Sequence, residues 1–362
     1  MPKKQRPVFA PPKFYKLSNK FDQKKLSHLL AQHKNIKVCD DYLEQQKELF
    51  YLKNPHLVLT PNEAEKAFRF YYFSLTNKQK EKQLGTWVFF PWLNTLTHIL
   101  EEEDYFKVRT SRNQKLIYPQ EQKAFYNAKV GIGGLSIGSS VATALIIQGG
   151  AKSIKIADFD RLALSNTNRI RASINNLGEP KTEILAKQLY EINPYQKIEI
   201  FSEGLTKHNI KSFVKDLDIV IDELDSFPAK IFLREEAKKQ KKPVIMGADV
   251  GNSAIVDIER YDLNQKTPYF NGRLGKVTSK TFFNLTKQKT GEYIAKLLGK
   301  QNHENRMLES LSEIGKSIVS WPQLGGTAIL NASALSYIAR MIITKQRLNK
   351  NRYIINLKEL LA

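Results

Sequence analysis

The residues with the clearest chemical potential begin at a glycine-rich segment that runs from Gly131 through Gly133 and Gly134 to Gly138. Glycines allow the backbone to approach a phosphate, and the amide groups at the start of a following helix supply donors and a favourable dipole. Asp158 ends the next apolar segment, where a carboxylate can accept hydrogen bonds from ribose hydroxyls. This much fits a dinucleotide-binding oxidoreductase as well as it fits an ATP-binding enzyme.

The polar residues farther along the chain favour a triphosphate. Asn166, Arg169 and Lys181 follow in order, and together they suit the phosphate end of a nucleotide that carries more negative charge than a dinucleotide. Asp225 comes after the apolar segment 219–222. A carboxylate at this position can hold Mg²⁺, a cation that prefers oxygen ligands and bridges phosphates. The ordered set therefore predicts a site for ATP and Mg²⁺.

These side chains can form one site only if the fold brings them to the same edge of a sheet. From Lys129 onward, short apolar segments alternate with helical ones, which is the pattern of βαβ units. We therefore predict an α/β protein with a Rossmann-like, doubly wound and mostly parallel sheet, whose ligand lies at the carboxyl ends of the strands. Near that edge, Asp249 and Asp257 are candidates to approach a substrate, but acids in such places are more often solvated loop residues, and this is what we expect. The expected strands are 129–132, 153–158, 197–201, 219–222, 243–246 and 254–260, and the expected helices are 139–148, 181–191 and 333–347.

The N-terminal part of the chain has a different pattern. Residues 1–12 are rich in proline and lysine and are expected to form a mobile basic arm. Residues 13–120 carry apolar residues at helical spacing, which predicts a mainly helical accessory domain. The aromatic cluster 87–92 within it is more typical of core packing than of a ligand platform. Residues 121–362 would then form the ATP-binding domain.

The composition is that of an ordinary globular protein, with 362 residues of which 41% are hydrophobic and 26% charged. No uninterrupted apolar run reaches the roughly 18–20 residues that span a bilayer, and the basic N-terminus lacks the apolar core of a signal peptide. We therefore expect a cytoplasmic protein without membrane contact. Cys39 is the only cysteine, which excludes intrachain disulfides and metal sites built from several thiolates.

The formal net charge is +21, from 57 Lys and Arg against 36 Asp and Glu. Such an excess can indicate binding to nucleic acid through counterion release. Only 14 of the basic residues are arginines, and the lysines are spread along the chain. The charge by itself therefore leaves tRNA as one alternative partner among several.

In this order, the motifs resemble those of the ThiF/MoeB and ubiquitin-activating-enzyme adenylation superfamily. The likeness runs from about Arg109 to Gly251. Members show patterns like R-Y-x-R-Q, V-G-x-G-G-L-G, D-x-D-x-x-x-x-S-N-x-x-R, G-x-x-K and D-x-x-D-N-F. The segments of this chain that match them are 109–113, 130–135, 158–169, 178–181 and 222–227.

The resemblance implies roles for individual residues and a reaction. A substrate carboxylate, on a protein tail or a small molecule, would attack the α-phosphate of ATP, so that pyrophosphate leaves and an acyl-adenylate forms. The catalytic residues would be Arg112, Arg169, Lys181 and Asp225. Arg112 would reach across a homodimer interface to the partner's ATP. The nucleotide and its ribose would be bound by Gly131, Gly133, Gly134 and Asp158, the phosphates by Asn166, Arg169 and Lys181, and Mg²⁺ by Asp225.

Two features depart from the family pattern. Ser136 stands where the family has the last glycine of G-G-L-G, which can change how the turn holds the triphosphate. The matching region also lacks the family's thioester or persulfide cysteine and the paired C-x-x-C zinc ligands, since Cys39 lies outside it. An activated acyl group would therefore pass directly to an amine, hydroxyl or sulfide, or cyclise.

Two branches of the superfamily fit the rest of the sequence. The N-terminal region and the segments 259–263 and 320–324 resemble a bacterial ThiF branch that is often fused to a nitroreductase-like domain, and this is the interpretation we favour. The segments 166–169 and 222–226, with Lys230, also resemble the tRNA threonylcarbamoyladenosine dehydratases. A nucleotide-binding scaffold without turnover is a third alternative.

Overall fold

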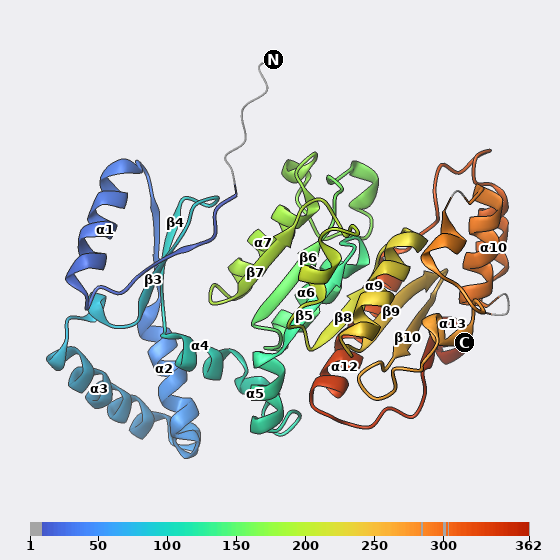
Figure 1. Cartoon of the computed structure of the whole chain (residues 1–362). Coiled ribbons are helices and arrows are strands. Elements are labelled where there is room, and N and C mark those ends of the chain that lie inside the picture. Colours follow the sequence, from blue (N-terminus) through green and yellow to red (C-terminus); the bar gives the residue numbers. More distant parts are fainter. Residues whose placement is uncertain (1–8, 284, 300–301, 303, 362) are drawn as a thin grey trace. The chain divides into compact units, whose positions relative to one another are not determined.

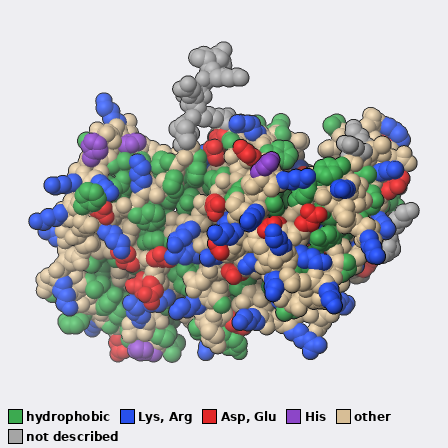
Figure 2. Space-filling view, in the orientation of Figure 1, with side chains coloured by type: hydrophobic (Ala, Val, Ile, Leu, Met, Phe, Trp, Pro, Cys, Tyr) green, Lys and Arg blue, Asp and Glu red, His purple; other side chains and the backbone are tan. Residues whose placement is uncertain are grey.

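The computed structural model describes residues 9–283, 285–299, 302 and 304–361, so most of the expected arm at 1–12 lies outside the described residues. The chain forms two compact units (Figure 1). The first comprises the residues up to Tyr118 together with Asn193–Tyr195, and the second comprises Pro119–Ile192 and the chain from Gln196 onward. On the face shown in Figure 2, Lys and Arg side chains are scattered among Asp and Glu rather than gathered in one patch.

The N-terminal unit combines helices with a four-stranded sheet of order β1-β3-β4-β2, in which β2 and β4 are parallel and the other pairs antiparallel. The sequence analysis predicted helices here but not the sheet. Strand β3 comes from the aromatic cluster, and its residues Trp87 and Phe89 pack with Tyr15, Leu26 and Leu29, which confirms that the cluster is core. The elements are β1 (Lys13–Tyr15), α1 (Lys20–Gln32), β2 (Lys37–Asp40), α2 (Tyr42–Lys53), α3 (Pro61–Lys78), β3 (Thr86–Phe90), β4 (Thr95–Ile99) and α4 (Glu102–Arg109).

The C-terminal unit is built around a seven-stranded sheet of order β11-β10-β9-β8-β5-β6-β7. The five neighbouring strands β9, β8, β5, β6 and β7 are parallel, and β10 runs antiparallel to both β9 and β11. This confirms the predicted Rossmann-like, mostly parallel sheet. Its strands are β5 (Lys129–Gly133), β6 (Ser153–Ala157), β7 (Lys197–Phe201), β8 (Ile219–Asp222), β9 (Val244–Val250), β10 (Ser253–Glu259) and β11 (Arg352–Asn356).

Two elements of this unit extend beyond their predicted ends. Strand β9 continues through Asp249, and helix α12 starts at Gly325 rather than at Ser333. Both extensions matter below because they add side chains to the candidate site. The helices of the unit are α5 (Pro119–Asn127), α6 (Ile137–Ile147), α7 (Lys181–Ile192), α8 (Ile210–Val214), α9 (Phe227–Lys239), α10 (Lys287–Leu298), α11 (Asn305–Ser312), α12 (Gly325–Ile343) and α13 (Leu357–Leu361).

The glycine-rich turn lies where the strand order of the sheet reverses. Strand β5 has β6 on one side and β8 on the other, and the N–H of Gly134 donates to the carbonyl of Ala157 at 2.8 Å. Gly134 has a φ of 86°, and a Cβ at this position would lie 2.1 Å from the carbonyl oxygen of Glu223. Glycine is therefore required here both by conformation and by space. The reversal point of such a sheet is where ligands bind.

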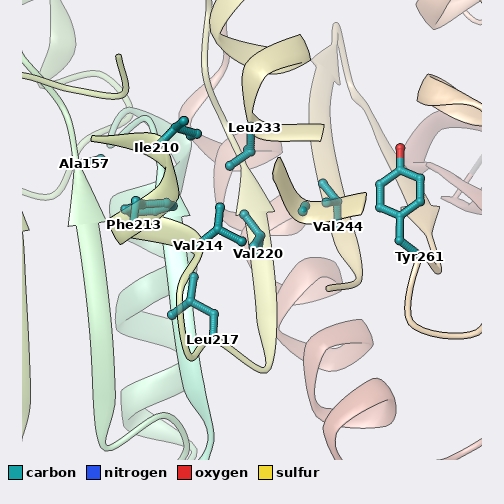
Figure 3. Packing of buried hydrophobic residues seen from close by; sticks show 10 residues of the cluster. Ala157, Ile210, Phe213, Val214, Leu217, Val220, Leu233, Val244 and Tyr261 are labelled. Carbon is teal, nitrogen blue, oxygen red and sulfur yellow. The ribbon is translucent and has the colours of Figure 1, made fainter. Parts of the chain in front are cut away.

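The core beside this turn holds the junction of β8 and α9 in place. Helices α8 and α9 pack against β8 and β9 through a buried cluster that includes Phe213, Val214, Val220, Leu233 and Val244, which are labelled in Figure 3. All of these side chains are buried. Burial of aliphatic and aromatic side chains supplies about 1.5–3 kcal/mol each, so the segment that follows β8 leaves the sheet from a rigid base.

Helix α12 is the one helix, among the residues that the structure describes, that is long and apolar enough to cross a membrane. The sequence analysis expected a helix at 333–347 but no membrane span, and Thr327, Asn331 and Ser336 interrupt the apolar residues of α12. These three polar side chains are buried, and α12 packs on α6, β9 and β10. Half of its most apolar stretch is buried inside the unit, which is typical of a core helix.

Candidate functional site

A cavity of about 420 Å³ lies next to the glycine-rich turn and is walled by the ends of β8 and β9 and by helix α10. Its volume falls in the range of small-molecule sites. It brings together Arg169 and Asp225, two predicted site residues that come from distant segments. The other polar residues that line it are Ser136, Glu223, Lys230, Asp249, Ser320 and Gln323, and the large apolar ones are Ile137, Leu224, Phe227, Met246, Ile294, Leu297, Leu298 and Trp321.

Arg169 is held at the cavity by a small network of hydrogen bonds. Its Nε donates to Ser136 Oγ at 2.9 Å, and its Nη1 donates to Asn168 Oδ1 at 2.9 Å and to the carbonyl of Ser165 at 3.3 Å. Asn168 in turn donates to the carbonyl of Gln323 at 2.9 Å. Ser136, which departs from the glycine of the resembling sequences, therefore provides the acceptor that orients the guanidinium.

Arg169 and Asp225 give the cavity one fixed positive charge and one accessible negative charge. Burial lowers the pKa of Arg169, while Asp225 and Asp249 raise it, and an arginine stays protonated under these conditions. Asp225 is exposed, and its carboxylate has no hydrogen bond or ion pair within the described part of the chain. This combination suits a phosphate and the cation that accompanies it.

Lys230 lines the cavity, but its charge is already paired. Its Nζ lies 3.1 Å from Oδ1 of Asp222, a fully buried carboxylate that also accepts a hydrogen bond from Arg234. Burial disfavours ionisation of Asp222, but Lys230 and Arg234 outweigh this effect and its pKa is lowered. Lys230 therefore connects the cavity to a buried ion network.

Asp158 and Lys181 form a second group next to the glycine-rich turn. The Asp158 carboxylate accepts hydrogen bonds from the N–H groups of Leu135 and Asp160, both at 2.7 Å. Lys181 Nζ donates to Asp160 Oδ2 at 2.7 Å and lies 4.0 Å from Asp158. Burial raises the pKa of Asp158, and Lys181 counteracts it. The Asp158 carboxylate thus stabilises the turn. A ribose hydroxyl would have to bind to its remaining lone pairs.

Two of the predicted glycines are explained by packing. A Cβ on Gly131 would lie 2.3 Å from the side chain of Leu217, and a Cβ on Gly133 would lie 3.0 Å from that of Leu205. Both positions are inside strand β5, so the core alone accounts for the choice of glycine there. Gly134 is the member of the set at which the backbone turns.

Asn166, Arg112 and Cys39 do not line the cavity. Asn166 Oδ1 accepts the N–H of Ala163 at 3.0 Å, which fixes the loop that leads to Arg169. Arg112 is exposed in a short 3-10 helix of the N-terminal unit, Ser111–Asn113. Cys39 lies in β2 of the same unit.

The structure corrects the expectation for two acids near the sheet edge. Asp249 and Asp257 were expected in solvated loops, and this is wrong for both. Asp249 lies in β9 with 6% of its surface exposed and lines the cavity. Asp257 lies in β10, is buried, and accepts a hydrogen bond from Arg352 at 2.7 Å. The available signal was that both follow unbroken apolar strand residues, where a charge is unusual.

Glu223 is a site residue that the sequence analysis did not single out. It directly follows β8, lines the cavity, and accepts the N–H of Gly247 through Oε1 at 2.9 Å. Burial raises the pKa of Glu223 to about 8. Lys230 lowers this pKa, whereas Asp249 and Asp222 raise it further. Burial likewise raises the pKa of Asp249 to about 6, although Asn331 and Arg169 oppose it. The cavity therefore contains two carboxyl groups that resist ionisation.

Replacing Glu223 by glutamine is expected to make the protein more stable than the wild type at pH 9 but not at pH 4. The ordinary pKa of a glutamate in the unfolded chain is 4.5 and the folded value is about 8, so the stability that this group gives is complete below pH 4.5 and is lost as the pH rises through 8. Glutamine cannot ionise, and it keeps the acceptor for Gly247. Urea unfolding of both proteins at the two pH values measures the difference, which should be on the order of a few kcal/mol at most.

An exposed acid serves as the control for this comparison. Glu203 lies in the turn after β7 and is exposed, so Glu203→Gln should leave the pH dependence of unfolding unchanged. An equal effect of Glu223→Gln at both pH values would contradict a raised pKa at this position.

Comparison with known proteins places the chain in a family. The model of the ThiF family matches residues 110–309. The chain is 32% identical over 266 residues to the uncharacterized protein MT1398 of Mycobacterium tuberculosis, an alignment that covers 74% of this chain and 37% of that protein. The sulfur carrier protein adenylyltransferase of Thermus thermophilus is 28% identical over 134 residues (36% and 48% of the two chains), and the tRNA threonylcarbamoyladenosine dehydratase of Escherichia coli is 32% identical over 124 residues (34% and 45%).

The alignments are partial, and the structural likeness concerns the fold. The chain spans less than half the length of each of these relatives. Among solved structures, Escherichia coli MccB with MccA-N7isoASN has a TM-score of 0.51 at 18% identity, over 71% of this chain and 77% of that one. The shared α/β architecture agrees with the sheet described above.

Proposed function

Because the chain belongs to the ThiF family, we propose that it is an ATP-dependent adenylyltransferase that activates a substrate carboxylate as an acyl-adenylate and releases pyrophosphate. The observation that carries this proposal is the cavity beside the glycine-rich turn, which unites a fixed Arg169 with an accessible Asp225. In a dinucleotide oxidoreductase, Arg169 and Asp225 would have no evident role, because the pyrophosphate of a dinucleotide carries less charge than a triphosphate.

The residues of the cavity suit the positioning and charge neutralisation that such a reaction needs. Arg169, oriented by Ser136 and Asn168, would donate to phosphate oxygens on which negative charge develops. Asp225 would hold Mg²⁺, and this fits because Mg²⁺ takes one or two protein carboxylates and fills its shell with phosphate oxygens and water. The bound cation would neutralise phosphate charge. Lys181, already held by Asp160, would have to exchange this partner for a phosphate.

The acyl group would leave the adenylate without a protein thioester. Cys39 is the only cysteine of the chain and lies in the N-terminal unit, outside the residues that match the family model. We therefore propose direct transfer to an external nucleophile or cyclisation. A homodimer in which Arg112 reaches the partner's ATP, and a cytoplasmic location, remain predictions.

Calorimetric titration of the full chain with ATP·Mg²⁺ and, separately, with NAD⁺ tests the nucleotide. We expect ATP·Mg²⁺ to bind and NAD⁺ not to bind. Asp225→Ala is expected to weaken ATP·Mg²⁺ binding about tenfold or more, because it removes the carboxylate that holds the cation. Without Mg²⁺ the variant should bind ATP at least as tightly as the wild type, because the free carboxylate would then only repel the triphosphate.

A surface acid provides the matched control for this substitution. Asp262 forms an ion pair with Arg260 and does not line the cavity, so Asp262→Ala should bind ATP·Mg²⁺ as the wild type does. Preference for NAD⁺, or a fully active Asp225→Ala protein, would contradict the proposal. Binding of ATP without pyrophosphate exchange for any carboxylate would instead favour the scaffold alternative.

A tRNA-modifying dehydratase is the second candidate, supported by the 32% identity to the Escherichia coli enzyme and by the net charge of +21. This candidate predicts that tRNA binds and that its binding weakens steeply with salt, since each phosphate contact releases counterions. Filter binding of unmodified tRNA from 50 to 300 mM salt, about the range over which such contacts are lost, measures this slope. No binding at the lowest salt would remove the candidate. The scattered Lys and Arg side chains on the face shown in Figure 2 do not point to one docking patch there.

A further inference from the structure

Three side chains beside the cavity form a buried group, the carboxyl cluster, that the reaction proposed above does not use. They are Glu223 and Asp249, with 8% and 6% of their surface exposed, and Asn331, which is fully buried. Asn331 Nδ2 donates to Asp249 Oδ1 at 3.0 Å. Glu223 and Asp249 line the cavity, while Asn331 reaches them from α12.

The carboxyl cluster has acceptors without donors. Within the part of the chain that the structure describes, Asp249 Oδ2 and Asn331 Oδ1 are buried and have no hydrogen-bond partner. A buried polar atom left in this state costs about 1–3 kcal/mol, so native proteins usually supply a partner. With Asp249 ionised, both atoms are acceptors. The missing partner is therefore a donor.

Strand β9 makes room for this cluster. A Cβ on Gly247, which lines the cavity, would lie 2.5 Å from Asn331 Oδ1 and 2.6 Å from Glu223 Oε1. Any other residue would displace both side chains. Glycine at this position thus keeps the oxygens of the cluster directly behind the cavity wall.

The chemistry of the cluster favours an ammonium group as the donor. An ammonium offers three N–H donors and a positive charge, whereas a hydroxyl offers one donor and no charge. The charge matters because two acidic side chains share this buried space, and a positive group would be attracted to both. Among the described residues, no group of three or more acidic, histidine or cysteine side chains is placed to hold a metal ion, so an organic cation fits better than a dedicated metal.

The remaining walls suggest what the ammonium is attached to. Arg169, which would face the phosphates and the attacking carboxylate, interacts electrostatically with Asp249, and both line the cavity, so a positive and a negative group face the same space. An α-amino acid carries the complementary pair on one carbon. The cavity also has an apolar wall, which consists of Phe227, Met246, Ile294, Leu297, Leu298 and Trp321.

We propose that the carboxyl cluster is an ammonium subsite and that the activated carboxylate is that of an α-amino acid with an apolar side chain. This inference rests on the proposed adenylation. The carboxylate oxygen would form a bond to the α-phosphorus of ATP, while the bond to the bridging oxygen breaks and pyrophosphate leaves with the electron pair. The amino group would stay protonated at Asp249 and Asn331, so that it cannot attack the acyl-adenylate.

The experiment compares amino acids with their deaminated counterparts. The probes are L-leucine and L-phenylalanine against 4-methylpentanoate and 3-phenylpropanoate. For the full chain, calorimetry measures binding of each probe and ATP–pyrophosphate exchange measures activation. We expect at least one amino acid to bind and react about tenfold or more better than its counterpart. In Asp249→Asn this preference should fall to threefold or less, and the KM for ATP should change by less than the preference does.

Controls separate the subsite from general damage to the fold. Asp262→Asn, outside the cavity, should keep the wild-type preference, and Glu223→Gln should reduce it by less than Asp249→Asn does. Thermal unfolding shows whether each variant is folded, so a misfolded Asp249→Asn leaves Glu223→Gln as the test. An unchanged preference in the folded variants would overturn the subsite.

The outcomes also separate this inference from the proposed function. Equal exchange with amino acids and deaminated acids would overturn the subsite and leave adenylation standing. Binding of an amino acid that depends on Asp249, without exchange, would support the subsite and contradict adenylation. If none of the four probes binds, the inference is wrong.

Discussion

Arg169→Ala is expected to lower carboxylate-dependent ATP–pyrophosphate exchange by about 10²–10³-fold, the loss that follows removal of one oriented donor to a developing charge. The guanidinium enters the cavity already oriented by Ser136 and Asn168. A preoriented donor stabilises charge on phosphate oxygens without reorganisation during the reaction. Alanine removes the charge and all the N–H donors of the guanidinium. Arg169→Lys keeps the charge but loses the planar fork, so its activity should fall between that of the wild type and that of Arg169→Ala.

Two neighbouring substitutions make the test of Arg169 specific. Arg171 is exposed and does not line the cavity of 420 Å³, so Arg171→Ala should change exchange by less than threefold. Ser136→Ala removes the acceptor that orients Nε of Arg169 and should give a smaller loss than Arg169→Ala, on the order of tenfold. Exchange at the wild-type rate in Arg169→Ala would exclude Arg169 from the reaction.

The part of the fold around the site could be predicted from the sequence because its strands are buried on both faces. Parallel strands of this kind appear as short continuous apolar runs, as in 129–133 and 219–222. The sheet of the N-terminal unit was missed for the opposite reason. Its strands β1 and β2 have three and four residues, and the parallel pairing of β2 with β4 joins segments far apart in the sequence, which local patterns do not indicate.

In the candidate site too, the local sequence pattern indicates some residues, whereas contacts between distant segments could not be predicted from it. Arg169 and Asp225 could be expected at one place because both follow strands whose carboxyl ends meet at one edge. The partner of Ser136 could not be expected, because Arg169 lies 33 residues away and the bond depends on how the intervening loop folds. Asn331 is 82 residues from Asp249 and belongs to a turn of α12 that the sequence pattern did not include. The role of Arg112 across a dimer stays a prediction.

Arg234→Met is expected to destabilise the C-terminal unit by about 3–5 kcal/mol, the cost of removing one partner from a buried ion network. Arg234 is fully buried and joins Asp222 to Glu259, with its Nε 2.8 Å from Glu259 Oε2. Its guanidinium also lies 3.9 Å from the centre of the Phe270 ring. Methionine fills much of the space but leaves Glu259 as a buried carboxylate without a cation, while Asp222 keeps Lys230.

Urea unfolding followed by circular dichroism measures this loss, and two variants establish its cause. Arg260→Ala breaks the partly exposed pair with Asp262 and should cost less than about 1 kcal/mol. In Arg234→Met combined with Glu259→Gln, the uncompensated charge is gone, so part of the lost stability should return. If the double variant is no more stable than Arg234→Met, the loss comes from packing rather than from charge. Since Asp222 connects Arg234 to Lys230 at the cavity, a stable double variant with weakened ATP binding would show that this network positions the site.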